Sequence, residues 1–243
     1  MGAFIPRDVQ EFLDGYPDLH DYRSLSRNLR FYSNELRCQP DCKLISEIHE
    51  EWLGDYSLLE TKHGYIQWLF PIREDGLNYA AQPLQKHEIK AMTKDDTIML
   101  QILTSYKLML DFYGMRLENE ATGLISRSKN YTSQYKNLCR SSHNNLRISR
   151  ILKCLSEFGY EHLNYAFLLH VLNEQSEHGQ LNTSIIRHSM DRWWANCVRG
   201  HRERDWINEK IVRVRNRDVD EPFVFTREMY EAAINNWNNE GRF

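Results

Sequence analysis

Apolar residues recur at helical spacing along most of the chain, and this periodicity predicts a succession of helices. Leu44, Ile45, Ile48 and Trp52 fall on one side of such a helix, and Asp41 before them has the chemistry of an N-cap. Further helices are expected after Asp55 toward Trp68, from 95 or 96 to 114, and at 130–138, 143–158, 161–175, 184–198 and beyond Thr226. The N-terminal 27 residues should hold a short helix and an extended lead-in.

The strongest helical signal begins at Asp95 or Asp96 and ends at Gly114, a residue type that favours helix C-termini. Its apolar side chains cover more than half of the helical circumference, which is typical of a helix at the centre of a bundle. We therefore predict an all-α fold, a single globular multi-helix bundle with a central buried helix at about 95–113.

Two stretches lack a clear helical pattern. Residues 116–128 are expected to form a looser connection, and the basic segment 211–215 has a β-leaning composition. Three regions follow from this pattern: an N-terminal lead-in at 1–27, a helical domain at 28–200, and a basic segment with a C-terminal helix at 201–243.

Composition supports a folded helical protein. Apolar residues make up 41% and charged residues 27% of the chain, and only 11 Gly and 6 Pro are present, too few for a many-turned β architecture. No apolar run reaches the roughly 20 residues of a membrane span, so any membrane association would be peripheral. The five scattered cysteines follow no secretory signal pattern, which indicates an intracellular, reducing environment.

Metal and cofactor sites are not expected. Cys38, Cys42 and His49 could form part of a metal site, but a fourth ligand is missing, and free thiols are the simpler interpretation. The chain has no glycine-rich phosphate loop, no His-Glu-x-x-His and no Gly-x-Ser-x-Gly. A single Glu60-x-x-His63 spacing falls short of a di-iron site. We predict a protein without catalytic activity, metal or cofactor.

Positive charge is concentrated in one block. The chain has a net charge of −3, yet residues 127–153 contain seven basic residues and no Asp or Glu, leaving 24 basic against 34 acidic residues elsewhere. Such a block would attract phosphate or carboxylate groups. The alternative is that these side chains form ion pairs with acidic clusters such as Glu47, Glu50 and Glu51.

The helix expected at 143–158 sharpens the anion hypothesis. His143, Arg147 and Arg150 share one of its faces, and Ser142 is a suitable N-cap that would add the positive end of the helix dipole. Tyr131 and Tyr135 would offer aromatic faces on which bases or peptide aromatics stack. Asn144 falls toward the apolar stripe, where it is expected to act mainly as a hydrogen-bonding structural residue.

Several strings resemble one known family. They are Asn28-Leu29-Arg30-Phe31-Tyr32, Tyr65-Ile66-Gln67-Trp68-Leu69-Phe70-Pro71 with Arg73-Glu74, Pro83-Leu84, Phe112-Tyr113-Gly114 with Arg116-Leu117, and Ser142-His143-Asn144-Asn145-Leu146-Arg147-Ile148 with Arg150-Ile151-Leu152-Lys153. In this order, over residues 28–200, the chain resembles the conserved region of the opioid growth factor receptor family.

That resemblance implies a helical binding protein for a short enkephalin-like peptide or a protein partner, located in the cytoplasm or nucleus and peripheral to the nuclear membrane. Trp68 and Phe70 are expected to anchor the end of one helix, with Gln67 and Arg73 as polar groups beside them. The alternative is that they form an aromatic-walled ligand site with directed donors. Nucleic acid or a phosphate anion at the basic block, and an enzyme acting on an anionic small molecule, are the alternatives. The candidate ligand-binding residues are Arg30, Gln67, Trp68, Arg73, Arg116, Arg127, Tyr131, Tyr135, Arg140, His143, Asn144, Arg147 and Arg150.

Overall fold

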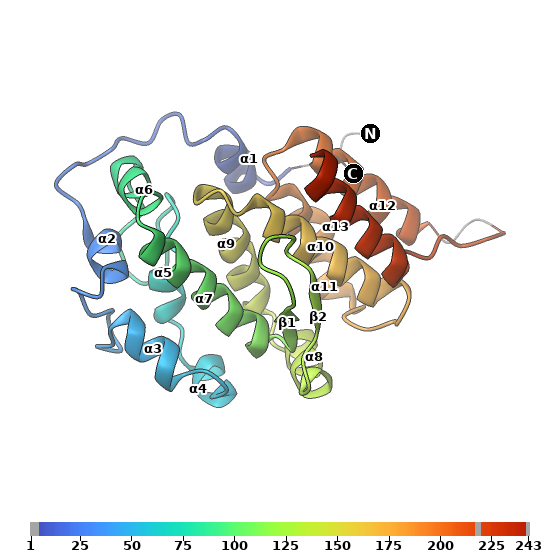
Figure 1. Ribbon diagram of the computed structural model, residues 1–243, viewed down its shortest axis with the longest axis horizontal. Coiled ribbons are helices and arrows are strands. Elements are labelled where there is room, and N and C mark those ends of the chain that lie inside the picture. Colours follow the sequence, from blue (N-terminus) through green and yellow to red (C-terminus); the bar gives the residue numbers. More distant parts are fainter. Residues whose placement is uncertain (1–4, 217–219, 242–243) are drawn as a thin grey trace. The chain divides into compact units, whose positions relative to one another are not determined.

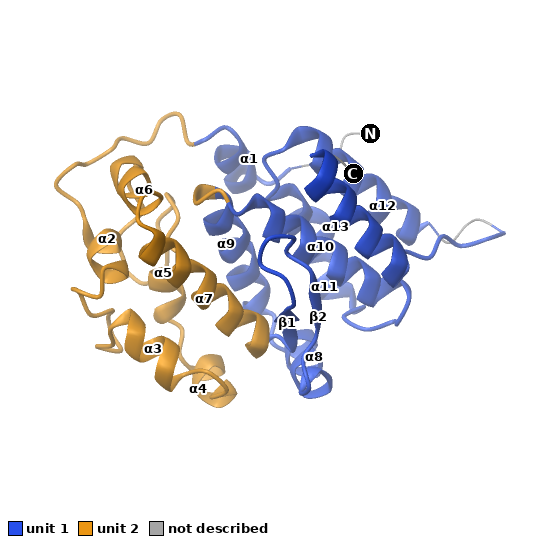
Figure 2. Cartoon of the chain, in the orientation of Figure 1, with its two compact units in different colours: residues 1–15, 113–156, 160–243 blue, residues 16–112, 157–159 orange. Residues whose placement is uncertain are grey.

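The computed structural model describes residues 5–216 and 220–241 of the chain, and the expected all-α fold is confirmed. The three regions expected from the sequence stay a prediction, and their outer bounds reach residues outside this description. The chain divides into two compact units (Figure 2). Unit 1 consists of residues 1–15, 113–156 and 160–243, and unit 2 of residues 16–112 and 157–159.

Unit 2 contains six of the helices labelled in Figure 1. These are α2 (Arg27–Tyr32), α3 (Ile45–Glu51), α4 (Tyr56–Thr61), α5 (Tyr65–Leu69), α6 (Lys86–Met92) and α7 (Asp96–Phe112). The helix predicted at 95–113 is α7, and its buried residues include Ile98, Ile102 and Tyr106. Asp95 accepts hydrogen bonds from the backbone N–H groups of Thr97 and Ile98 and so caps α7.

The helix expected from Asp55 to Trp68 is instead two short helices. Asp55 caps α4 as predicted, since its side chain accepts from Leu58 N at 2.9 Å. The chain then becomes extended at Lys62 and passes Gly64, where a Cβ would lie 2.6 Å from Pro40 Cδ. This close packing against a distant residue leaves no room for a side chain, and the local sequence carries no signal for it.

The start of α3 also differs from expectation. Asp41 does not cap it but forms an ion pair with Lys62 (Oδ1–Nζ 2.8 Å). The helix begins at Ile45, and the Glu47 side chain accepts from Leu44 N at 2.9 Å. The N-terminus of α3 is therefore stabilised by a carboxylate within its first turn, and not by an acidic residue that precedes the helix.

A buried carboxylate joins α2 to α6, two helices that the sequence pattern did not predict. Glu88 on α6 has no exposed surface. It accepts from Asn28 N (3.0 Å), Asn28 Nδ2 (3.0 Å), Leu29 N (3.2 Å), Gln82 Nε2 (2.9 Å) and Gln85 N (3.0 Å). The carboxylate therefore replaces the missing intrahelical partners at two helix starts at once.

Unit 1 contains the remaining elements. They are α1 (Arg7–Leu13), β1 (Met115–Leu117), β2 (Ile125–Arg127), α8 (Tyr131–Arg140), α9 (His143–Glu157, apart from its last residue), α10 (Glu161–Ser176), α11 (Ser184–Arg192), the 3₁₀ helix η1 (Trp194–Asn196), α12 (His201–Arg215) and α13 (Arg227–Glu240). The stretch expected to be loose at 116–128 forms an antiparallel ribbon in which Arg116 pairs with Ser126.

The most enclosed helix of unit 1 is α10, which contacts α12, α13 and β2 (Figure 1). Every residue from Leu163 to Gln175 is buried, so its polar side chains need partners inside the protein. Asn164 Nδ2 donates to Leu152 O (2.8 Å), and Asn173 Nδ2 donates to Phe225 O (3.1 Å). Because α10 is buried on all sides, its polar side chains bind backbone groups of neighbouring segments of unit 1.

Two predictions for the C-terminal half were wrong and one was confirmed. The helix expected over 184–198 ends at Arg192 and is followed by η1, and the β-leaning piece at 211–215 is the last turn of α12. Alternating Ile, Val and Arg also suits a helix, because Ile207 and Ile211 lie one turn apart and are buried. Thr226 caps α13 as expected, accepting from Met229 N at 3.3 Å.

We predict that Glu88→Ala lowers the free energy of unfolding by about 3–5 kcal/mol, because several buried N–H donors lose their acceptor. Glu88→Gln, which keeps one acceptor oxygen, should lose about half as much. Urea unfolding followed by circular dichroism measures both. A loss below about 1 kcal/mol for Glu88→Ala would show that water replaces the carboxylate.

Candidate ligand-binding surfaces

The string Tyr65–Pro71 forms α5 and the two residues that follow it. Gln67 and Trp68 are buried there, and their polar groups bind neighbouring backbone. Gln67 Nε2 donates to Asn78 O (3.1 Å), Gln67 Oε1 accepts from Asn78 N (2.7 Å), and Trp68 Nε1 donates to Gln39 O (3.0 Å). Gly76 lies against the Gln67 amide, where a Cβ would be 2.3 Å from Nε2. Both side chains therefore hold loops in place.

The loop held in this way comprises residues 74–80. Asn78 Nδ2 donates to Gln39 O (2.7 Å) and Gly64 O (3.1 Å), while its Oδ1 accepts from Ala80 N (3.1 Å). Arg27 Nη1 donates to Ala80 O at 2.9 Å. The backbone of the 74–80 loop is thus fixed from both sides by side chains of unit 2.

The same loop exposes two large apolar side chains. Leu77 is 90% exposed and Tyr79 is 96% exposed, more than any other exposed large hydrophobic residue in the described chain. Neither residue is among the candidates expected from the sequence. The sequence does carry a signal for this exposure. Leu77 and Tyr79 lie in the turn-forming string Asp75-Gly76-Leu77-Asn78-Tyr79, where no helix or strand could bury them.

Arg30 and Arg73, also in unit 2, occupy different environments. Arg73 is buried, donates from Nη2 to Leu19 O (3.1 Å), and its guanidinium carbon lies 5.5 Å from the centre of the Tyr16 ring. Arg30 is exposed and lies 4.0 Å from Glu35. Arg73 therefore fixes the segment that precedes α2, whereas Arg30 faces solvent.

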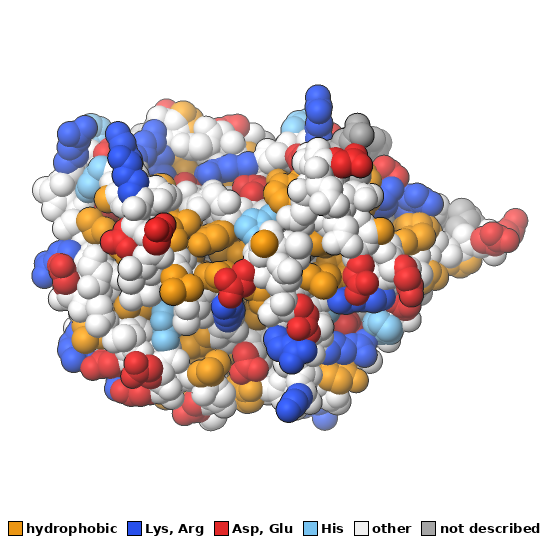
Figure 3. Space-filling model, viewed as in Figure 1, with side chains coloured by type: hydrophobic (Ala, Val, Ile, Leu, Met, Phe, Trp, Pro, Cys, Tyr) orange, Lys and Arg blue, Asp and Glu red, His pale blue; other side chains and the backbone are white. Residues whose placement is uncertain are grey.

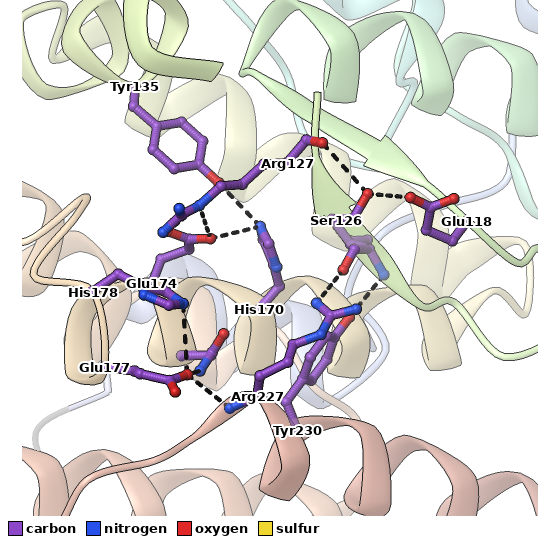
Figure 4. A network of polar contacts seen from close by, with 12 residues as sticks. Glu118, Ser126, Arg127, Tyr135, His170, Glu174, Glu177, His178, Arg227 and Tyr230 are labelled. Atoms are coloured by element: carbon purple, nitrogen blue, oxygen red, sulfur yellow. Dashed lines mark hydrogen bonds and ion pairs between the residues drawn. The ribbon is translucent and has the colours of Figure 1, made fainter. Parts of the chain in front are cut away.

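In unit 1, Arg127 forms a bidentate ion pair with Glu174 on α10 (Figure 4). Arg127 Nε lies 2.8 Å from Glu174 Oε1, and Nη2 lies 2.7 Å from Oε2. The guanidinium also lies over the Tyr131 ring, 4.8 Å from its centre. This basic residue is neutralised by a buried carboxylate, as the ion-pair alternative anticipated, although its partner is Glu174 rather than the acidic clusters considered.

Tyr135 and His170 continue this network (Figure 4). The Tyr135 hydroxyl and His170 Nε2 are 3.1 Å apart, and His170 Nε2 is 3.8 Å from Glu174 Oε1. Burial, together with the nearby charges of Arg227, Arg127 and His178, lowers the pKa of His170 to about 3. Burial raises the pKa of Tyr135, an effect that the Glu174 charge reinforces. The histidine and the phenol are therefore neutral at physiological pH.

A second set of contacts ties β2 to α13 (Figure 4). Ile125 N donates to the Tyr230 hydroxyl (2.9 Å), and Arg227 Nη1 donates to Ile125 O (2.7 Å). Arg227 N donates to Glu177 Oε2 at 2.8 Å. Together with the Arg127–Glu174 pair, these contacts fasten the β-ribbon to α10 and α13.

The rest of the basic block divides into internal and exposed residues. Arg147 and Asn144 are buried and joined through Nη1 and Oδ1 (3.1 Å), and Lys153 is buried and pairs with Asp8 (2.9 Å). His143 and Arg150 are half-buried. Arg116, before the block, pairs with Glu118 at the surface.

Lys129, Lys136 and Arg140 are the exposed members of the block. Lys136 and Arg140 lie one turn apart on α8, and Lys129 precedes that helix. Within residues 5–216 and 220–241, no carboxylate forms an ion pair with any of the three. The structure thus separates the cations into a structural group and this exposed group, while the ligand-binding roles assigned from the sequence stay a prediction.

Residues 5–216 and 220–241 contain no group of three or more His, Cys, Asp or Glu side chains placed to hold a metal ion. None of their helices combines the length and the apolar character that crossing a bilayer requires.

Comparison with known proteins places this helical fold, built around buried polar networks, in a receptor family. Residues 21–229 match the model of the Opioid growth factor receptor (OGFr) conserved region. The chain belongs to the opioid growth factor receptor family, which confirms the resemblance seen in the sequence.

Individual relatives support this assignment. The chain is 44% identical to the opioid growth factor receptor of Homo sapiens over 170 residues, which cover 69% of this chain and 25% of the relative. It is 40% identical over 205 residues to the Mus musculus receptor, covering 83% and 32% of the two chains. Opioid growth factor receptor-like protein 1 of Mus musculus is 37% identical over 203 residues, covering 83% and 43%. The match therefore spans less than half of each relative, and no solved structure matches.

Removal of the Arg127 guanidinium should destabilise the folded protein. We predict that Arg127→Ala lowers the free energy of unfolding by about 2–4 kcal/mol, because Glu174 stays buried without its cation. Arg116→Ala is the matched control, since its pair with Glu118 is more exposed and should cost less than about 1 kcal/mol. Equal losses in urea unfolding would contradict the structural role of the Arg127–Glu174 pair.

Acidification should destabilise the protein through His170. The pKa of this residue is about 3 in the folded protein and 6.5 for a free side chain, so the unfolded chain takes up a proton first as pH falls below 6.5. The free energy of unfolding should then fall by about 1.4 kcal/mol per pH unit from this residue alone. His170→Gln should show a shallower decline between pH 6.5 and 4.5 in urea unfolding; parallel curves would contradict the assignment.

Proposed function

We propose that the chain is a non-catalytic binding protein that recognises a short peptide or a segment of a partner protein through the 74–80 loop. The observation that carries this proposal is the near-complete exposure of Leu77 and Tyr79 on a backbone fixed by Gln67 and Asn78. The relatives are named receptors, which also supports a ligand-binding role.

The preorganised backbone of the 74–80 loop favours binding. A tyrosine loses little conformational entropy when it becomes an interface anchor, and its ring and hydroxyl serve both apolar and polar contacts. Because the loop backbone is already fixed, little ordering remains to oppose association. Burial of Leu77 and Tyr79 against a partner would remove apolar area from water at about 25 cal/mol per Å².

The exposed cations Lys129, Lys136 and Arg140 support a second candidate function, the binding of a phosphate-rich ligand. Such binding would rest on charge, because Tyr135 is buried and Arg127 lies over the Tyr131 ring, so stacking of bases on these rings has little support. Phosphate binding would weaken steeply with rising salt, whereas binding at the 74–80 loop would respond weakly.

The enkephalin pentapeptide is the first probe for the peptide proposal. Isothermal titration should give saturable binding that Tyr79→Ala weakens by about tenfold or more, the effect typical of a buried aromatic anchor. Leu77→Ala should weaken it less. These exposed positions are sharper tests than the buried Trp68 and Arg147, whose substitution would also disturb packing.

The control is Leu53→Ala, which removes an exposed leucine elsewhere in unit 2 (61% exposed) and should leave binding unchanged. If the pentapeptide gives no heat, displayed random peptides selected on the chain provide a second probe. Selected peptides that bind the Leu77→Ala, Tyr79→Ala double variant as well as the original chain would overturn the proposal, as would the absence of any selected binder.

A further inference from the structure

A second row of exposed cations lies on α6 of unit 2, outside the basic block identified in the sequence. Lys86 and Lys90 are one turn apart on this helix, Lys94 lies in the turn that follows, and Arg23 lies in the segment before α2. All four are exposed, and none forms an ion pair with a carboxylate of the described residues. Figure 3 shows Lys and Arg side chains gathered over α6.

The segment 19–25 is fixed beside the start of α6. Tyr22 N donates to Gln85 Oε1 (2.8 Å), and the two His87 ring nitrogens contact Asp21 Oδ1 (3.1 Å) and Leu25 O (2.9 Å). These contacts place Arg23 on the same side of unit 2 as the N-terminal turn of α6. The cations and the segment therefore form one surface, called the α6 surface below.

Apolar side chains accompany the cations on the α6 surface. Leu19, Tyr22 and Leu25 all expose more than a third of their area, although they lie within seven consecutive residues of a well-anchored segment. A row of cations alone would suit any polyanion. Adjacent leucine and tyrosine side chains add a preference for a ligand that carries apolar groups next to its negative charges.

None of the nearby carboxylates among the described residues forms an ion pair with these four cations. Glu88 is buried with its five donors, Asp21 contacts His87, and Asp95 caps α7. Asp18 and Asp96 are exposed, but neither forms an ion pair with the α6 cations. The ammonium groups of Lys86, Lys90 and Lys94 thus stay available to a negatively charged ligand.

We propose that the α6 surface is a docking site for an acidic segment of another protein that also carries apolar side chains. Lys86 and Lys90 are separated by about 6 Å along the helix axis. Carboxylates four residues apart on a helix, or two apart on a strand at about 6.8 Å, match this spacing. A nucleic acid would match the charges but would leave Leu19 and Leu25 without apolar contacts. This inference does not depend on the 74–80 loop.

The test uses a fluorescein-labelled synthetic peptide with glutamate and leucine at helical spacing, and fluorescence anisotropy as the readout. We expect saturable binding to the chain, and none for the same peptide with lysine in place of glutamate. The triple variant K86Q/K90Q/K94Q should weaken binding by about tenfold or more, as expected for the loss of several complementary charges.

The matched control is the triple variant K129Q/K136Q/R140Q, which removes the same charge from the α8 region and should change affinity less than about twofold. Tyr22→Ser and Leu25→Ser test the apolar part and should each weaken binding by about fivefold. All of these positions are exposed, so circular dichroism should show unchanged folding and thermal stability within about 0.5 kcal/mol.

Three results would overturn the proposal. Equal losses in the two triple variants would mean that the peptide responds only to net charge. Unchanged binding in Tyr22→Ser and Leu25→Ser would remove the apolar part. Tighter binding of single-stranded RNA, or of vesicles containing phosphatidylserine, with the same dependence on the α6 lysines would assign the α6 surface to a nucleic acid or a lipid surface instead.

Discussion

A buried carboxylate must find a donor for each of its oxygens, and in both units this requirement determines where a distant segment lies. Glu88 in unit 2 gathers backbone and side-chain donors from α2 and from the start of α6, so that α2 is fixed beside α6. Glu174 in unit 1 holds Arg127 and, through it, the β-ribbon. Desolvating either carboxylate without these partners would cost several kcal/mol, so the loops and the helices must order together.

Local signals predicted the elements that local interactions stabilise. The helix α7 was predictable because Asp95 caps it and because apolar side chains surround it, and α13 because Thr226 caps it. The break between α4 and α5 was not predictable, since it depends on Gly64 packing against Pro40 across 24 residues of sequence. The helices α2 and α6 were missed for a related reason: both are short, and Glu88 stabilises them from inside the fold.

The candidate sites show the same division between local and distant interactions. Counting charges located the basic block, but the partners of Arg127 and Lys153 lie 47 and 145 residues away in the sequence and could not be assigned from spacing. The lysines at 86, 90 and 94 follow an i, i+4, i+8 pattern, but counting charges does not single them out because the surrounding sequence is not unusually basic. Exposure, rather than the number of charges, distinguishes the ion-paired Arg127 and Lys153 from the lysines on the α6 surface.

The strings that carry the family resemblance mainly build the framework. Gln67 and Trp68 fix loops through backbone hydrogen bonds, and Asn144 with Arg147 forms a buried pair, so replacing any of them would disturb the fold before it reached a ligand. The exposed side chains lie outside these strings, at Leu77, Tyr79 and the α6 surface. A fixed framework of this kind can present a few exposed side chains to a ligand without reordering the backbone, because recognition depends on the few side chains that leave water on binding.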